Sequence, residues 1–260
     1  MKLAISNLAW GKKDNYKLIK YLQTQTINFL EYSPYKLFLF HENYQQIIKF
    51  YKKKNINLYS MQSIFFNENN CYIFGNNFER KLFFNKLKNK INLASRFGTK
   101  IIVFGSPTTR KIFGLTKKQQ YNIAVNLFKK IATLCKKKKI IFCFEANPKI
   151  YGCEFINTTE EALKFVKIIN NEYFKINLDL GTIIYNKENY FNLISKNIEH
   201  IGHVQLSVPG LDSLKKYYKT IYKFLKTLKS FKYCKIVSIE TLNLNFYSIK
   251  KDIVFVKKLF

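Results

Sequence analysis

The stretch Ile140-Ile-Phe-Cys-Phe-Glu145-Ala-Asn-Pro148 decides the fold. It is an apolar run of strand length that ends in a carboxylate and a proline-containing turn. Strands buried on both faces of a parallel sheet have this continuous hydrophobic character, whereas half-exposed strands alternate. In α/β folds the chemistry lies at the carboxyl ends of such strands. Glu145 is therefore a candidate functional residue.

Three later apolar segments also carry an oxygen-bearing side chain at or near their ends. They are 174–179 with Asp179, 201–207 with Gln205, and 235–240 with Glu240. Successive parallel strands present their carboxyl ends at one rim, so we expect the four side chains to converge there.

Strand and helix signals alternate along the whole chain. Strands are expected at 2–6, 27–31, 56–62, 100–104, 140–145, 174–179, 201–206 and 235–240, and helices at 16–23, 42–54, 78–96, 116–134, 162–169, 190–198, 214–228 and 247–259. Eight strand–helix units predict an α/β fold, a single (β/α)8 TIM barrel that spans residues 1–260 as one domain. An open doubly wound sheet is the alternative, but residues 6–10, Ser-Asn-Leu-Ala-Trp, are not the glycine-rich phosphate loop that it would need.

Composition fits a reduced, cytoplasmic protein with a large core. Hydrophobic residues make up 47% of the chain, no apolar run has the length of a membrane helix, and the N-terminus predicts a strand rather than a signal peptide. The five cysteines are odd in number and form no CxxC pair, which predicts free thiols.

The formal net charge of +29 raises the question of a nucleic-acid or anionic-membrane partner. The lysines are scattered over nearly every expected helix, they greatly outnumber the arginines, and the chain is rich in residues with A/T-rich codons. A phosphate-reading surface concentrates its charge and uses more arginine. We therefore expect no specific nucleic-acid partner and no membrane partner.

Carboxylates brought together at one rim raise each other's pKa unless a cation neutralises them. A divalent metal is the natural solution, and oxygen-only ligands favour Mg²⁺ or Mn²⁺ over Zn²⁺. The expected metal ligands are Glu145, Asp179, Gln205 and Glu240.

The chain resembles the xylose-isomerase-like TIM-barrel family, which includes sugar phosphate isomerases and ketose 3-epimerases. The matching pieces follow one another, one for nearly every strand: 31–34 (EYSP), 61–63 (MQS), 104–107 (FGSP) with Arg110, 144–148 (FEANP) with 151–152 (YG), 177–181 (NLDLG), 203–205 (HVQ) and 239–240 (IE). The resemblance implies one divalent metal at the rim and a carbohydrate substrate.

Carried over residue by residue, the resemblance makes Glu145 and Glu240 metal ligands and the catalytic acid/base pair, and makes Asp179 a ligand. The metal would polarise the substrate carbonyl and stabilise an enediolate. Carboxylates on both sides of the reacting carbon would remove a proton on one face and return it on the other. The implied activity is that of a sugar isomerase or epimerase.

Three positions depart from the family pattern. Gln205 stands where the family has a histidine ligand, which puts the choice or retention of the metal in question. Thr182 and Leu211 replace a histidine and an arginine that grip the substrate in ketose 3-epimerases. The substrate specificity is therefore expected to differ from theirs.

Five further residues at strand ends are candidates for substrate binding: Trp10, Glu31, Gln62, Arg110 and Asn147. Arg110 could hold a phosphate or carboxylate through its guanidinium, or form a surface salt bridge. Glu31 and Gln62 could bind sugar hydroxyls or be structural polar residues. Trp10 could cover a sugar face or pack at the rim, and His203 is expected to point away from Gln205 toward the helices.

Proteins of the same fold also perform other functions. Apurinic endonucleases need a trinuclear zinc cluster rich in histidine, and this chain has three histidines in all. A dehydratase acting on an inosose or polyol would use the same enediolate chemistry. A catalytically inactive sugar-binding barrel is the non-enzymatic alternative. The sequence leaves the oligomeric state open, including a homo-oligomer.

Overall fold

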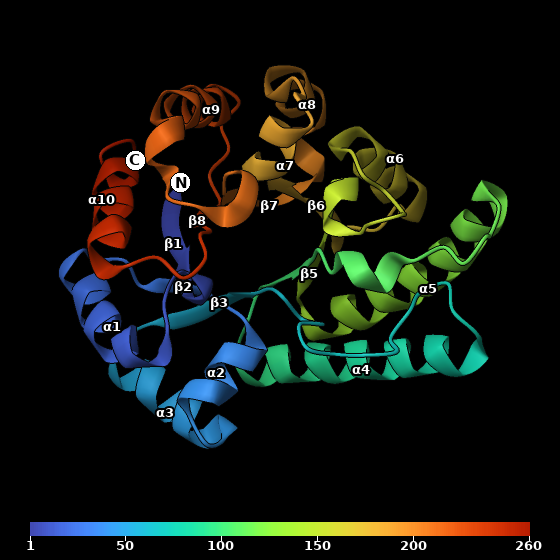
Figure 1. Ribbon diagram of the computed structural model, residues 1–260, viewed down its shortest axis with the longest axis horizontal. Helices are drawn as coiled ribbons and strands as arrows, with labels where there is room; N and C mark the ends of the chain where they lie inside the picture. Colours follow the sequence, from blue (N-terminus) through green and yellow to red (C-terminus); the bar gives the residue numbers. More distant parts are fainter.

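Eight parallel strands form one closed barrel in the computed structural model, which describes all 260 residues (Figure 1). The strands are β1 (Lys2–Ser6), β2 (Phe29–Tyr32), β3 (Asn57–Met61), β4 (Ile101–Phe104), β5 (Ile141–Glu145), β6 (Phe174–Asp179), β7 (Ile201–Leu206) and β8 (Ile236–Ile239). Each strand pairs with the next in chain order, and β8 pairs with β1. The predicted TIM barrel is confirmed, and the open-sheet alternative is wrong.

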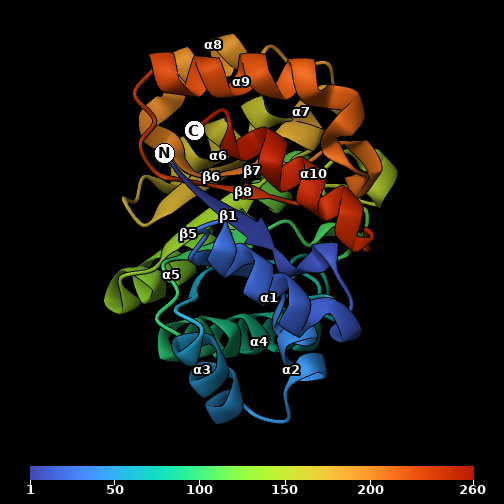
Figure 2. The ribbon, with the colours of Figure 1, turned by 90° about the vertical axis from the view of Figure 1, so that its left-hand side faces the viewer.

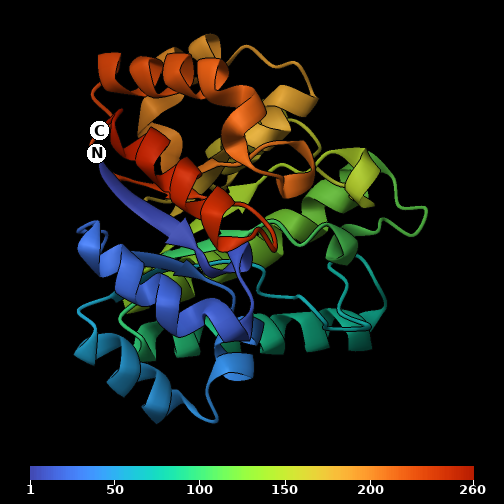
Figure 3. The ribbon, with the colours of Figure 1, turned by 60° about the vertical axis from the view of Figure 1, so that its left-hand side comes forward.

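Ten helices surround the barrel (Figure 1). They are α1 (Asn15–Thr24), α2 (Pro34–Phe40), α3 (Tyr44–Lys53), α4 (Asn77–Arg96), α5 (Lys117–Lys138), α6 (Thr159–Ile169), α7 (Leu180–Tyr185), α8 (Tyr190–Asn197), α9 (Tyr218–Ser230) and α10 (Phe246–Lys257). Helices α8 and α9 lie on one side of the barrel, and α3 and α4 lie on the opposite side (Figure 2 and Figure 3). None of the helices has the length and apolarity needed to cross a membrane.

Local capping sets where several helices begin. The Thr158 hydroxyl accepts a hydrogen bond from the Glu161 amide, and the Glu161 carboxylate accepts one from the Thr158 amide, which forms a capping box at the start of α6. The same reciprocal pair forms between Asn76 and Glu79 at α4. Each box satisfies backbone donors that would otherwise lack a partner at the helix start.

Aromatic side chains fill the space between the barrel and the helices. Fully buried phenylalanines from β4, β5, β6, α5 and α6 pack against one another: Phe104, Phe128, Phe142, Phe144, Phe165 and Phe174. The rings of Phe142 and Phe174 are stacked with centroids 5.6 Å apart. This layer covers the outward face of these strands, whereas Ile101, Val103 and Cys143 at the alternate positions form a separate small apolar cluster.

The interior of the barrel contains a register shift at Gly202. Ile176 pairs with Ile201, whereas Asn177 pairs with His203, so β7 has one extra residue there. His203 and Gln205 both point inward, and the His203 Nε2 lies 2.8 Å from Glu31 Oε2. The expectation that His203 faces the helices is wrong, because residues two apart in a strand share a face.

Gly202→Ala is expected to destabilise the barrel by about 1–3 kcal/mol through overpacking. A Cβ at this position would lie 2.5 Å from Cys143 Sγ and 2.7 Å from the Lys175 Cβ. Gly11→Ala is the matched control, because its Cβ would have no neighbour within 4 Å. Urea unfolding of the three proteins measures the difference, and equal midpoints would contradict the expectation.

Candidate active site

A cavity of about 300 Å³ opens at the carboxyl ends of the strands. Its lining includes Glu145, Asp179 and Glu240, together with Asn147 and Thr182. The barrel thus brings three of the four predicted rim residues into one cavity.

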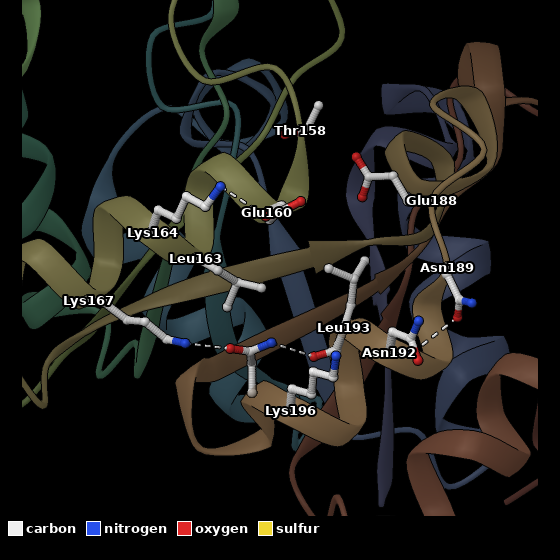
Figure 4. A pocket seen from close by; sticks show the side chains of 11 residues that line it. Thr158, Glu160, Leu163, Lys164, Lys167, Glu188, Asn189, Asn192, Leu193 and Lys196 are labelled. Carbon is white, nitrogen blue, oxygen red and sulfur yellow. Dashed lines mark hydrogen bonds and ion pairs between the residues drawn. The ribbon is translucent and has the colours of Figure 1, made fainter.

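A larger hollow of about 590 Å³ lies elsewhere, between the outer helices α6 and α8 (Figure 4). Lys164, Lys167 and Lys196 line it, and Lys164 is paired with Glu160 at 2.9 Å. It contains none of the predicted site residues. The smaller cavity at the barrel rim is therefore the candidate active site.

Glu145 ends β5 and is held at both carboxylate oxygens. The Asn147 Nδ2 donates to its Oε1 at 2.6 Å, and the Asn177 Nδ2 donates to its Oε2 at 2.8 Å. Burial, followed by the nearby carboxyl of Asp179, raises the pKa of Glu145 to about 8. A carboxyl group with such a pKa can give or take a proton near neutral pH.

Asp179 ends β6 and caps the helix that follows directly, α7. Its Oδ1 accepts a hydrogen bond from the Thr182 amide at 2.6 Å, and the Ser207 hydroxyl donates to its Oδ2. Burial raises the pKa of Asp179 despite these bonds. The short helix that starts at Leu180 was not predicted, because its start signal is the functional aspartate itself.

Glu240 follows β8 and reaches the same cavity. Its pKa is raised well above the ordinary value by burial first, and then by the carboxyl groups of Asp179, Glu145 and Glu31. Three neighbouring carboxyl groups thus oppose one another's ionisation.

Gln205 is not a lining residue of the cavity and is fully buried. Its Nε2 donates to Glu31 Oε1 at 2.8 Å, and its Oε1 accepts a hydrogen bond from the Asn177 Nδ2. The amide oxygen that was expected to bind a metal is therefore already engaged within the barrel.

Three of the four expected metal ligands have side chains that suit a divalent metal, and the fourth does not. No group of three or more histidine, cysteine, aspartate or glutamate side chains has its donor atoms gathered as a metal site requires. The donor chemistry of Glu145, Asp179 and Glu240 nevertheless suits a hard cation, since these are buried oxygen donors whose carboxyl groups raise one another's pKa. Gln205 in its present hydrogen bonds does not fit as the fourth ligand.

Of the five candidate substrate-binding residues, only Asn147 lines the cavity. Trp10 is fully buried and donates from Nε1 to Asn15 Oδ1 at 3.0 Å. Gln62 and Glu31 bond to each other inside the barrel at 3.2 Å. In this arrangement their polar atoms bind protein groups.

Arg110 is fully buried, and it forms no surface salt bridge. Its guanidinium donates to the carbonyl groups of Gly105 and Phe155 and to the Asn147 Oδ1. It also lies over the ring of Phe144, 5.0 Å from the ring centroid. Arg110 thus fixes the loop after β4 and orients Asn147, which in turn binds Glu145.

Sequence reasoning did not single out Asn177 and Ser207. Asn177 stands two residues before Asp179 in the same strand, and Ser207 stands two residues after Gln205. Period-two alternation places each on the inward face beside the predicted residue, and this was the signal that could have found them.

Gly105→Ala is expected to lower substrate turnover by about tenfold or more while leaving the barrel folded, because a small displacement of a catalytic group slows the reaction strongly. A Cβ there would lie 2.9 Å from Glu145 Oε1 and 3.4 Å from Asn147 Oδ1. The measurements are substrate turnover and thermal unfolding, with Gly11→Ala as control. Unchanged turnover would show that Glu145 accommodates the extra methyl group.

The sequence model of the xylose isomerase-like TIM barrel family matches residues 12–258. The chain belongs to this family. The family assignment agrees with the closed barrel and with the resemblance read from the strand-end motifs. No curated protein matches the sequence.

Solved structures share the fold at low sequence identity. The 3-keto-D-glucoside 4-epimerase of E. coli aligns with a TM-score of 0.80 at 14% identity, over 100% of this chain and 98% of that one. D-Psicose 3-epimerase of Clostridium cellulolyticum H10, solved with D-tagatose, gives 0.75 at 16%, over 100% and 95%. The IolI protein, solved with a zinc atom, gives 0.74 at 16%, over 100% and 99%. At such identities the likeness shows the fold alone.

Proposed function

We propose that this protein is a divalent-metal-dependent sugar isomerase or epimerase that moves a proton on the carbon beside a carbonyl group. The observation that carries the proposal is the joint placement of Glu145, Asp179 and Glu240 in one cavity at the carboxyl rim of the barrel. Membership of the xylose isomerase-like family and the sugar epimerases among its structural neighbours support it. Five free cysteines, four of them buried, support a reducing cytoplasmic setting.

Glu145 and Glu240 would act as the acid/base pair. Burial and neighbouring carboxyl groups raise the pKa of Glu145 to about 8 and raise the pKa of Glu240 well above its ordinary value, which favours the protonated form of both groups. The ionised group removes the proton from the substrate carbon and keeps it, and the other, protonated group donates its own proton to the opposite face or to the adjacent carbon. Asn147 and Asn177 fix the direction of the Glu145 oxygens through hydrogen bonds of 2.6 and 2.8 Å.

Glu145, Asp179 and Glu240 would hold the metal, with Mn²⁺ or Mg²⁺ as the ions that suit these oxygen donors. A bound divalent ion supplies Lewis-acid polarisation of the substrate carbonyl. Thr182 and Ser207, which both bond to Asp179, keep that side chain at the rim.

The substrate is an uncharged sugar. No lysine or arginine lines the cavity, although 45 of the 260 residues are basic. The buried Arg110 donates to carbonyl groups and to Asn147 instead of facing the cavity. A phosphate group among three carboxyl groups would lack a positive partner. Leu211 and Leu242 line the cavity as well and suit the carbon skeleton of a monosaccharide.

Proton exchange in deuterated water tests the proposal. The protein, supplied with Mn²⁺ or Mg²⁺, is incubated with a panel of free ketoses and their phosphates, and deuterium incorporation is followed by NMR. We expect incorporation into at least one free sugar and a new epimer or isomer. Absence of exchange across the panel would overturn the enzymatic proposal, and exchange confined to phosphates would overturn the uncharged substrate.

A further inference from the structure

A continuous line of hydrogen bonds runs through the barrel interior to Glu145. The Asn177 Nδ2 bonds both to Glu145 Oε2, at 2.8 Å, and to Gln205 Oε1. The Gln205 Nε2 continues the line to Glu31 Oε1 at 2.8 Å. Each of the two amide side chains thus joins one neighbour to the next.

The inner end of this line is a hydrogen-bonded pair, Glu31 and His203, whose side chains are 0% and 1% exposed. The Glu31 Oε2 accepts from the Ser60 hydroxyl and lies within hydrogen-bond distance of His203 Nε2, both at 2.8 Å. These partners come from β2, β3 and β7, so the pair is fixed by three strands. It gives the amide line an anchor that cannot easily rotate.

We propose that Gln205 and Asn177 are positioning residues that hold Glu145 in place from the buried Glu31–His203 pair, and that Gln205 is not a metal ligand. An amide has one acceptor oxygen and one donor nitrogen, and Gln205 uses both within the barrel. Turning its oxygen to the rim would leave the Asn177 donor and the Glu31 oxygen without these bonds, which is costly in a buried site. The hydrogen bonds of this line are independent of the proposed function, whereas their effect on turnover rests on it.

Side-chain amide exchange measured by NMR tests the line without substrate or metal. The Asn177 amide protons should exchange slowly in the native protein and at least about tenfold faster in Gln205→Ala, since one proton loses its acceptor. Gln205→Met, which keeps the side-chain length, serves if the alanine variant does not fold. Ser238→Ala is the control, because Ser238 is fully buried, pairs in register with Gln205 and has an unpartnered hydroxyl. Equal exchange in the Gln205 variants and the native protein would overturn the line.

A second experiment tests the role of Gln205 toward the metal and Glu145. Titration with Mn²⁺ alone should give Gln205→Met a loss of affinity no greater than that of Asn177→Ala, because both substitutions act on the metal through Glu145. A loss at least about tenfold larger in Gln205→Met than in Asn177→Ala would identify Gln205 as a ligand and overturn the proposal. Asn177→Ala should lower kcat about ten- to a hundredfold with little change in KM. The double variant, Gln205→Met with Asn177→Ala, should have a kcat no lower than that of the slower single variant. If the two losses in kcat multiply instead, the two residues do not act through one line of hydrogen bonds.

These readouts separate the two proposals. A native protein that binds no Mn²⁺ and exchanges no substrate proton would overturn the proposed function, while the amide exchange of Asn177 would still decide whether the line exists.

Discussion

Glu240→Gln and Glu145→Gln each lower proton exchange at the substrate carbon by about a hundred- to ten-thousandfold, the usual contribution of a positioned acid or base. Glutamine keeps the shape of the side chain but can neither accept nor release the proton. Both residues line the rim cavity, and burial together with neighbouring carboxyl groups raises the pKa of each. Deuterium incorporation, followed by NMR at saturating substrate, measures the loss.

Glu172→Gln is the matched control for this pair. Glu172 is an exposed carboxylate that forms an ion pair with Lys136 on the surface, at 3.0 Å. Its substitution should leave exchange unchanged within experimental error. Thermal unfolding must show that all three variants remain folded, and exchange retained in either cavity variant would remove that residue from the acid/base pair.

Glu31→Ala lowers the free energy of unfolding by about 3 kcal/mol or more, because it leaves several buried donors without their acceptor, each at a cost of about 1–3 kcal/mol. Glu31 is fully buried and accepts hydrogen bonds from Ser60, Gln62 and Gln205 in addition to its pairing with His203. Truncation therefore removes acceptors from several buried donors at once. Urea unfolding at neutral pH measures the loss.

The pH dependence of stability provides a second check on Glu31. Burial alone would raise the pKa of Glu31, but the adjacent His203 and the hydrogen bonds that Glu31 receives lower it below its usual value. The stabilisation is therefore present above the pKa of the unfolded chain and is lost as pH falls through the lower folded value. This acid-side loss should be absent in Glu31→Ala and retained in Ser238→Ala. Parallel pH curves for native protein and Glu31→Ala would contradict the assignment.

The barrel and the rim position of the three acids could be predicted because both depend on local pattern. Apolar runs of strand length that end in Glu145, Asp179 and Glu240 can be recognised in the sequence, and closure of the sheet brings their ends together. The orientation of Gln205 could not be predicted in this way. It depends on Asn177 and Glu31, partners from other strands that satisfy the amide before a ligand can.

Arg110 shows the same limit. A loop arginine at the rim predicts either an anion site or a surface pair, yet its guanidinium is buried against the carbonyl groups of Gly105 and Phe155. Helix α2 escaped prediction because its sequence, Pro34–Phe40, is almost uniformly apolar and aromatic and lacks helical periodicity. In each case tertiary contacts decided an outcome that local pattern left open.

The polar interior of this barrel limits how its sequence can diverge. A single apolar replacement at position 31, 203 or 205 leaves a buried donor or acceptor without a hydrogen-bond partner. A tolerated change at one of these positions therefore requires a change at its partner as well. Homologues with an apolar residue at 203 should also lack the acid at 31, and pairwise covariation between these two positions is expected across related sequences. The interior positions are thus expected to change together in evolution, while residues of the lysine-rich exterior can be substituted one at a time.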